Sequence, residues 1–196
     1  MKKALDEFAL DQVFRTARTY NKFSAQPVTD LIIANLFELL KWGPTAVNCQ
    51  PARFVFVRSP EAKARLIPCL APGNVGKVEN APVTVIVATD QKFYDQLPVQ
   101  WTAYDAKKTF VDDPAMTEVA GLRNSSLQGA YLILAARSLG LDCGPMSGFD
   151  NDKVDQTFLA GKNWKSNFLV NLGYGTDGGF YPRGPRLSHN DVIQIL

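Results

Sequence analysis

The chain has 196 residues, of which 46% are hydrophobic and 20% charged, the composition of one ordinary globular domain over residues 1–196. Its 21 Lys and Arg against 19 Asp and Glu leave a formal net charge of only +2, which argues against the broad basic face of a nucleic-acid-binding protein. No apolar run approaches the roughly 18 residues that span a bilayer, so we expect no membrane partner either.

Apolar spacing, caps and helix breakers divide the first half of the chain into helices and strands. A helix is expected to begin at Thr29 or Asp30, either of which is a good cap, and to stop at Gly43-Pro44. The run Val83–Thr89 is apolar on both faces, as in a central strand that is covered on both sides. The other expected elements are a helix over residues 5–19, a strand over 53–58 and a short helix over 60–66.

One long helix dominates the second half of the chain. Asp112 or Asp113 caps it, Pro114 occupies its first turn and Gly140 ends it. Residues 91–109 are rich in aromatic side chains and fit either a lid or a short helical excursion. A further helix is expected over 150–161, a strand over 167–172 and a last helical turn from 190. The apolar face expected on the long helix consists of Met116, Val119, Leu122, Leu127, Tyr131 and Leu134.

The order of these elements, helices first and then strands separated by helices, predicts an α+β fold. We expect a mixed β-sheet wrapped by helices rather than a regular repeat of strand and helix. The long helix is rich in alanine and carries more apolar surface than one monomer can cover. A homodimer that buries this central helix is therefore expected.

The cysteine and histidine content limits the chemistry. Cys49, Cys69 and Cys143 are odd in number and not closely paired, which argues against disulfides or a zinc site and favours the cytoplasm. His189 is the one histidine of the chain, so a His-rich metal centre within one chain is excluded. We therefore expect no metal site, and a nucleophile paired with this histidine is disfavoured by its polar surroundings near the C-terminus.

The segment Gly173–Gly178 spells the G-x-G-x-x-G pattern of dinucleotide-binding folds directly after a predicted strand. That mechanism needs a helix whose N-terminus meets the pyrophosphate, followed by another strand. Glycines and prolines follow instead, and only 18 residues remain after Gly178. The pattern is interpreted as a flexible exit from a strand.

Three other stretches have both a functional and a purely structural interpretation. Arg15 and Arg18, with Thr16 beside them, share a helical face and suit a phosphate or flavin clamp, or form a solvated surface. The loop over residues 42–51 offers small and amide-bearing side chains to a planar ligand, or is a packed connection. The loop over residues 143–150 brings backbone N–H groups to the mouth of a sheet, or is a glycine-rich turn capped by Asp150.

Taken together, these stretches resemble the FMN flavoproteins of the nitroreductase-like family. The closest resemblance is to its malonic semialdehyde reductase branch, also called 3-hydroxypropionate dehydrogenase. The resemblance covers essentially the whole chain in the right order. It is carried by residues 15–19 (RTART), 41–45 (KWGPT) with Asn48, 123–126 (RNSS), 144–150 (GPMSGFD) and 185–188 (PRLS).

The resemblance implies which residues hold the flavin. Its phosphate would lie against Arg18 and Arg186, with Arg15 and Thr16 nearby, whereas Phe14 stands where many relatives have a further arginine. The pyrimidine edge, the partner's flavin and the isoalloxazine ring would be contacted by three further groups. Asn74 and Lys77 would lie at the pyrimidine edge of the flavin, and Pro44, Thr45 and Asn48 would reach the flavin of the other subunit. Along the isoalloxazine ring would lie Pro145, Met146, Ser147 and Gly148. The N–H groups of Ser147 and Gly148 would face the N5 and O4 edge of the ring.

The activity implied by the resemblance is ping-pong hydride transfer from NADH or NADPH, through FMN at the subunit interface of a homodimer, to a small carbonyl compound. The substrate would be malonic semialdehyde, reduced to 3-hydroxypropionate, and the flavin N5 rather than a protein side chain would carry the hydride. Two alternatives stay open. One is a broad-specificity nitro, quinone or enone reductase, and the other is a flavin-binding protein without turnover.

Overall fold

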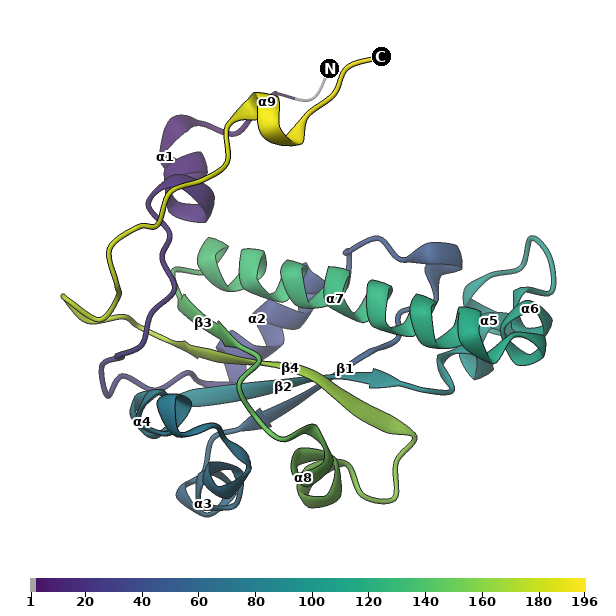
Figure 1. Cartoon of the computed structure of the whole chain (residues 1–196), viewed down its shortest axis with the longest axis horizontal. Helices are drawn as coiled ribbons and strands as arrows, with labels where there is room; N and C mark the ends of the chain where they lie inside the picture. The colour runs from purple at the N-terminus through teal and green to yellow at the C-terminus, as the bar shows by residue number, and fades with distance from the viewer. Residues whose placement is uncertain (1–2) are drawn as a thin grey trace.

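The computed structural model describes residues 3–196, so Met1 and Lys2 of the expected domain lie outside the described residues. Its centre is a four-stranded antiparallel sheet in the order β1-β2-β4-β3 (Figure 1). The α+β architecture with a long helix is confirmed. All neighbouring strands in the sheet run antiparallel, whereas a mixed sheet also contains parallel pairs. Among the described residues, parallel pairing occurs only as a single bridge between Thr19 and Cys143. The strands are β1 (Ala52–Val57), β2 (Val83–Asp90), β3 (Asp142–Met146) and β4 (Trp164–Gly173).

Helices cover both faces of the sheet, and alternate residues of β2 serve the two sides (Figure 1). Val85 and Val87 pack in the core beneath α2 and α7, whereas Ile86 packs in the core beneath α3, α4 and α8. The predicted central strand over 83–89 is therefore confirmed. The helices are α1 (Glu7–Leu10), α2 (Asp30–Leu40), α3 (Pro60–Leu66), α4 (Pro72–Asn80), α5 (Leu97–Gln100), α6 (Ala106–Asp112), α7 (Pro114–Ser138), α8 (Asn151–Val154) and α9 (His189–Val192).

The helices with clear caps form where the sequence predicts them. The Thr29 side chain caps α2 by accepting from the N–H of Ile32, and the Asp113 side chain caps α7 by accepting from the N–H of Met116. Gly140, at φ 77°, takes the left-handed conformation that ends the long helix. The aromatic segment 91–109 turns out to be a series of short helical pieces, and none of the described helices is long and apolar enough to cross a membrane.

Three elements differ from the expectation. The helix predicted over 5–19 is α1 followed by a π-helical turn over Asp11–Arg15, so it ends four residues early. Residues 143–146 of the predicted loop over 143–150 belong to the edge strand β3, where Pro145 is tolerated because one side of an edge strand needs no N–H donor. Helix α4 lies in a stretch for which the sequence predicts no helix, because its two glycines and two asparagines are poor helix formers.

The face of α7 that packs on the sheet consists mostly of small residues with three polar side chains among them, and is not the apolar face that the sequence predicts. Met116, Val119, Leu122 and Leu127 are exposed on the described chain. Small residues permit close approach, since a Cβ at Gly129 would lie 2.3 Å from Cζ of Phe168. The buried residues of α7 are Ala120, Gly121, Asn124, Ser125, Gln128, Gly129, Leu132, Ala135 and Ala136.

Two glycine substitutions test this packing. Gly129→Ala is expected to lower the free energy of unfolding by about 1–3 kcal/mol, because the added methyl group overpacks the contact with Phe168. Gly76→Ala, in α4 with no atom within 4 Å of the new Cβ, is expected to raise it by about 0.5–1 kcal/mol. Urea unfolding of both variants measures the difference, and equal stabilities would contradict the close approach of α7 to the sheet.

Candidate functional site

A cavity of about 530 Å³ lies between the two ends of the chain and is strongly cationic. We call it the cationic cavity. No Asp or Glu is among its lining residues, and none of its five cations has a carboxylate partner among the ion pairs of the described residues. A cluster of unneutralised cations favours an anionic ligand. The five cations are Arg18, Lys77, Arg137, Arg183 and Arg186.

Contacts between the N-terminal segment and the C-terminal tail build one wall of this cavity. The guanidinium of Arg18 lies 4.6 Å from the ring centroid of Phe180 and donates to the main-chain oxygen of Tyr181. Arg183 donates to the main-chain oxygens of Arg15 and Ala17, at 2.7 and 3.1 Å. The tail therefore runs beside the segment that carries Arg18, and the two predicted phosphate ligands, Arg18 and Arg186, line the same cavity.

A chain of side-chain hydrogen bonds on α4 holds Lys77 at another wall. Lys77 Nζ donates to Oδ1 of Asn74 at 3.0 Å, and Nδ2 of Asn74 donates to the main-chain oxygen of Gly148 at 2.9 Å. A Cβ on Gly148 would lie 2.7 Å from that same Nδ2 atom, so a larger residue here would displace the Asn74 side chain. Buried Asn171 supports the helix from below by donating to the main-chain oxygen of Lys77 at 3.0 Å.

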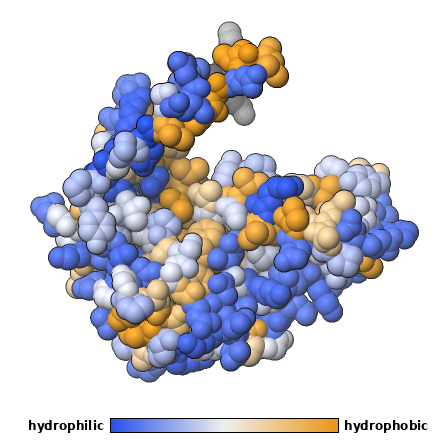
Figure 2. All heavy atoms as spheres, in the orientation of Figure 1, coloured by the Kyte–Doolittle hydropathy of each residue, from blue (hydrophilic) through white to orange (hydrophobic). Residues whose placement is uncertain are grey.

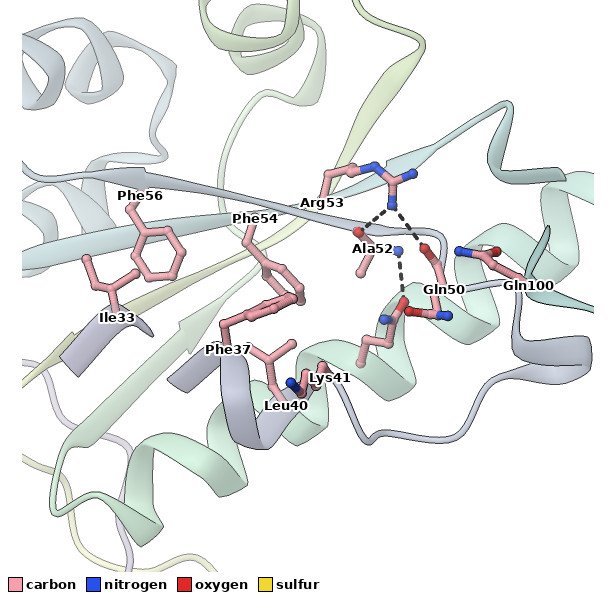
Figure 3. A pocket seen from close by; sticks show the side chains of 11 residues that line it. Ile33, Phe37, Leu40, Lys41, Gln50, Ala52, Arg53, Phe54, Phe56 and Gln100 are labelled. Atoms are coloured by element: carbon pink, nitrogen blue, oxygen red, sulfur yellow. Dashed lines mark hydrogen bonds between the residues drawn. The ribbon is translucent and has the colours of Figure 1, made fainter. Parts of the chain in front are cut away.

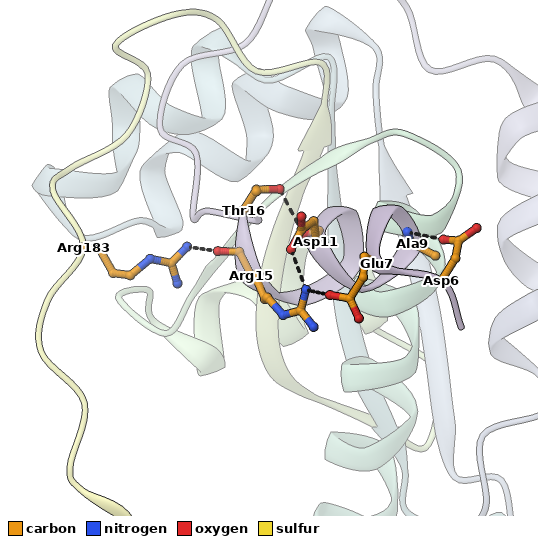
Figure 4. A network of polar contacts seen from close by, with 7 residues as sticks. All are labelled: Asp6, Glu7, Ala9, Asp11, Arg15, Thr16 and Arg183. Carbon is orange, nitrogen blue, oxygen red and sulfur yellow. Dashed lines mark hydrogen bonds and ion pairs between the residues drawn. The ribbon is translucent and has the colours of Figure 1, made fainter. Parts of the chain in front are cut away.

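Arg15 and Thr16 do not line the cationic cavity. Arg15 pairs with Glu7 at 2.6 Å and with Asp11 at 2.9 Å, and these bonds, the one to Glu7 first, raise the pKa of Arg15 (Figure 4). Thr16 donates to the main-chain oxygen of Asp11 at 2.9 Å. Because the helix ends in a π-helical turn at Arg15, Arg15 and Arg18 do not share the helical face that their spacing predicts.

The strand-and-turn segment 145–148 lies beside α4. Pro145 and Met146 end strand β3, paired with Val170 and Leu169, so they are part of the sheet rather than of a free loop. Pro145 and exposed Ser147 face solvent, and Met146 packs partly into the core beneath α3 and α4. The main-chain oxygen of Gly148 accepts from Asn74 and from the N–H of Ala71, so the turn is attached to α4, and none of residues 145–148 lines the cationic cavity.

The loop that carries Pro44, Thr45 and Asn48 does not line the cationic cavity within one chain. Thr45 Oγ1 accepts from the N–H of Gln50 at 3.2 Å, and Asn48 Nδ2 donates to the main-chain oxygen of Gln100 at 3.3 Å. The first bond lies within the loop, and the second attaches the loop to the end of α5. Its residues reach the flavin only if the flavin belongs to another copy of the chain, as the resemblance implies.

Two cavity cations were missed by the sequence reasoning. Arg137 lies in the last turn of α7, a position typical of a residue that interacts with free helix carbonyls, and it donates to the main-chain oxygen of Val13 at 3.0 Å. That position is the signal that could have drawn attention to it. Arg183 stands in a glycine- and proline-rich tail without periodicity, so no local pattern predicts its role.

A second hollow, here called the apolar groove, has a volume of about 370 Å³ and lies between α2 and β1 (Figure 3). Phe37, Phe54 and Phe56 line it, with glutamine amides at one end. Arg53 at its margin is neutralised by Asp90 at 2.8 Å. The groove therefore offers apolar surface and hydrogen-bonding amides rather than charge. It is lined by Ile33, Phe37, Leu40, Lys41, Gln50, Ala52, Arg53, Phe54, Phe56, Gln100 and Gln128.

Two of the buried thiols are held in the neutral form. Burial raises the pKa of Cys49 to about 11 and that of Cys143 to about 12, so neither is a nucleophile near neutral pH. No group of three or more potential metal ligands of the His, Cys, Asp or Glu type occurs within residues 3–196. The polar chemistry of the site is therefore that of cations and amides.

Alkylation rates test the state of these thiols. Iodoacetamide is expected to modify Cys49 in the folded protein at least 100-fold more slowly than in urea, because a shift of the pKa to about 11 leaves roughly 100-fold less thiolate at pH 8. Mass spectrometry of timed samples measures the rate. Equal rates in the two states would contradict the burial of this side chain.

Known proteins resemble this chain in both sequence and fold. A model of the nitroreductase family matches residues 14–174. A Stenotrophomonas maltophilia (strain R551-3) protein with the provisional name NADH dehydrogenase/NAD(P)H nitroreductase is 56% identical over 195 residues, which is 100% of both chains. A provisionally assigned nitroreductase from Exiguobacterium sibiricum, solved in complex with FMN, has a TM-score of 0.81 at 24% identity and covers 100% of this chain and 99% of that one. The enone reductase CLA-ER of gut-bacterial fatty acid saturation has a TM-score of 0.81 at 19% identity, with 98% of this chain and 100% of that one covered.

Proposed function

The chain belongs to the nitroreductase family, and from this premise we propose that it is an FMN-dependent oxidoreductase that uses NADH or NADPH as hydride donor. The observation that carries the proposal is the cationic cavity, whose five cations have no carboxylate partner among the described residues. The FMN complex of the Exiguobacterium sibiricum protein, which has the same fold, supports the same cofactor.

The donor set of the cavity fits the phosphate end of FMN. Guanidinium groups form short charge-assisted bonds to phosphate oxygens, and Arg18, Arg183 and Arg186 present such groups from two segments of the chain. Lys77 and Asn74 supply a cation and an amide on one helix turn, suited to the polar edge of the flavin ring. Their bond to each other keeps both side chains in place before a ligand arrives.

When bound, FMN supplies the hydride chemistry, taking a hydride from NAD(P)H and passing it to the oxidant in ping-pong order. The residues of this chain bind and orient the cofactor. Lys77 would place a positive charge toward the bound ring and so would favour a reduced, anionic flavin, because preorganised charge stabilises charge that develops during the reaction. No protein side chain needs to serve as catalytic acid, base or nucleophile in the hydride step.

A homodimer with FMN at the subunit interface completes the proposal. Two apolar surfaces of the described chain support it. Leu122 and Leu127 on α7 are 55% and 43% exposed, and apolar residues gather at the tip of the C-terminal arm that extends from the body of the molecule (Figure 2). Exposed apolar surface of this extent is typical of protein interfaces. In such a dimer the loop with Pro44, Thr45 and Asn48 contacts the partner's flavin.

Malonic semialdehyde is the oxidant that the sequence resemblance favours. The second candidate is a reductase of broad specificity for nitro, quinone and enone compounds, with which the name of the Stenotrophomonas maltophilia relative is equally consistent. The two candidates share fold, cofactor and hydride donor, and they differ in the group that is reduced, an aldehyde in one case and a nitro, quinone or enone group in the other. Turnover of malonic semialdehyde, a nitroarene, a quinone and an enone, each with NADH and with NADPH, separates them.

The visible spectrum of the purified protein tests the proposed function. We expect a yellow protein with stoichiometric FMN, whose flavin absorbance is bleached by NADH or NADPH without oxygen and returns when an oxidant is added. Flavin absorbance that persists under anaerobic NADH and NADPH would favour a flavin-binding protein without turnover. A colourless protein that takes up no FMN would overturn the proposal.

A further inference from the structure

The loop over residues 45–52, here called the 45–52 loop, holds a backbone conformation that its side chains disfavour. Val47, Asn48 and Gln50 have φ angles of 46°, 53° and 41°. This left-handed region suits glycine and is particularly unfavourable for a β-branched residue such as valine. A conformation of this kind persists only when the surrounding structure imposes it, and it is found most often at functional sites.

Two buried amides on α7 impose the conformation from opposite ends of the loop. Asn124 Oδ1 accepts from the N–H of Ala46 at 2.8 Å, and Gln128 Oε1 accepts from the N–H of Ala52 at 2.9 Å. The two amides are four residues apart, so one face of a rigid helix presents both acceptors. The Asn124 side chain is itself fixed, because its Nδ2 donates to the main-chain oxygen of Ala120 at 2.8 Å.

Packing against the sheet alone does not explain why two amide side chains occupy these buried positions. Asn124 and Gln128 are only 2% and 5% exposed, and a buried amide is costly unless it is hydrogen-bonded. The other residues on this face of α7 are mostly small and apolar, which is sufficient for contact with the sheet. The side-chain oxygens of Asn124 and Gln128 both accept hydrogen bonds from backbone N–H groups of the loop, and these bonds explain why two amides are buried on this face.

We propose that Asn124 and Gln128 are positioning residues that hold the 45–52 loop in the shape that receives the flavin of a second copy of the chain. The inference rests on the proposed function and deepens it. Asn48, exposed at the tip of the loop, and Thr45, at its start, are the groups whose placement depends on the two anchors. The loop is thus ordered before the cofactor binds, so binding does not have to order it.

Gln128→Met tests one anchor, because methionine matches the length of glutamine but lacks the acceptor oxygen. Gln128→Glu is the matched control that keeps an acceptor at the same place. Asn124→Ala tests the other anchor separately, so failure of one variant to fold leaves the second. Hydrogen exchange of the cofactor-free full-length protein is expected to show faster exchange at the N–H of Ala52 in Gln128→Met, and of Ala46 in Asn124→Ala, with exchange in β2 unchanged.

Titration with FMN provides the second measurement. The dissociation constant of FMN is expected to rise about tenfold in Gln128→Met and in Asn124→Ala, and to return toward the original value in Gln128→Glu. Unchanged loop exchange, or lost protection with unchanged FMN affinity, would overturn the inference. A wild-type chain that binds no FMN would overturn the proposed function instead. In that case the exchange rates would still test whether Asn124 and Gln128 hold the loop.

Discussion

Replacing Arg18 and Arg186 together with methionine is expected to weaken FMN binding about 100-fold or more. Each charge-assisted hydrogen bond to a phosphate contributes on the order of 1.5–3 kcal/mol, so two contribute about 3–6 kcal/mol. Because Arg186 is exposed, solvent screening places the expected loss at the lower end of that range. Methionine keeps much of the aliphatic stem, and fluorescence titration of the cofactor-free protein with FMN measures the change.

Arg15→Met is the matched control for this double variant. Arg15 lies on the same N-terminal segment but is neutralised by Glu7 and Asp11 outside the cationic cavity. Its replacement is expected to change FMN affinity by no more than about twofold, because an exposed ion pair contributes little free energy. A loss equal to that of the double variant would show that the charge of the whole N-terminal segment matters, and not the cavity.

Placing two glutamates on the exposed face of α7 is expected to abolish the dimer. In Leu122→Glu/Leu127→Glu, assembly would bury unpaired carboxylates, each at a cost of several kcal/mol, so the dimer dissociation constant should rise at least about 1000-fold. Sedimentation velocity at micromolar concentration measures the change. Loss of the dimer is expected to remove FMN as well, because the partner's loop would no longer contact the flavin.

The corresponding alanine variant is the control for this prediction. Leu122→Ala/Leu127→Ala removes apolar area without burying charge, so the dimer is expected to weaken by much less. Circular dichroism checks that the glutamate variant keeps its helices, which is expected because both side chains already face solvent in one chain. A glutamate variant that remains dimeric, or a folded monomer that retains full FMN affinity, would contradict the proposed interface.

The sequence predicts those elements whose ends are determined locally. Thr29 and Asp113 accept hydrogen bonds from the first turns of α2 and α7, and β2 is mostly apolar because both of its faces are buried. Strand β3 escapes prediction because Gly144 and Pro145 are poor strand formers that only an edge position tolerates. The buried face of α7 escapes it because close approach to the sheet selects glycine and alanine, and because Asn124 and Gln128 bind the 45–52 loop, so this face carries no apolar period.

The candidate site depends on contacts that no local pattern contains. Arg18 and Arg186 stand 168 positions apart in the sequence, and only the course of the C-terminal tail along the N-terminal segment brings both to one cavity. The resemblance to a flavoprotein family supplied this pairing, whereas spacing alone grouped Arg15 with Arg18. Asn124 lies in the 123–126 stretch of the resemblance, but neither it nor Gln128 receives a role from the sequence, since amides on a helix are usually exposed and their partners lie in a distant loop.

Titration of the cofactor-free wild-type protein with FMN and, in parallel, with riboflavin tests the central claim that the cationic cavity receives the flavin phosphate. The two ligands share the ring and the ribityl chain and differ in the phosphate. We predict that FMN binds at least about 100-fold more tightly, and that its advantage shrinks as the salt concentration rises. Equal affinities for FMN and riboflavin at low salt would contradict the account.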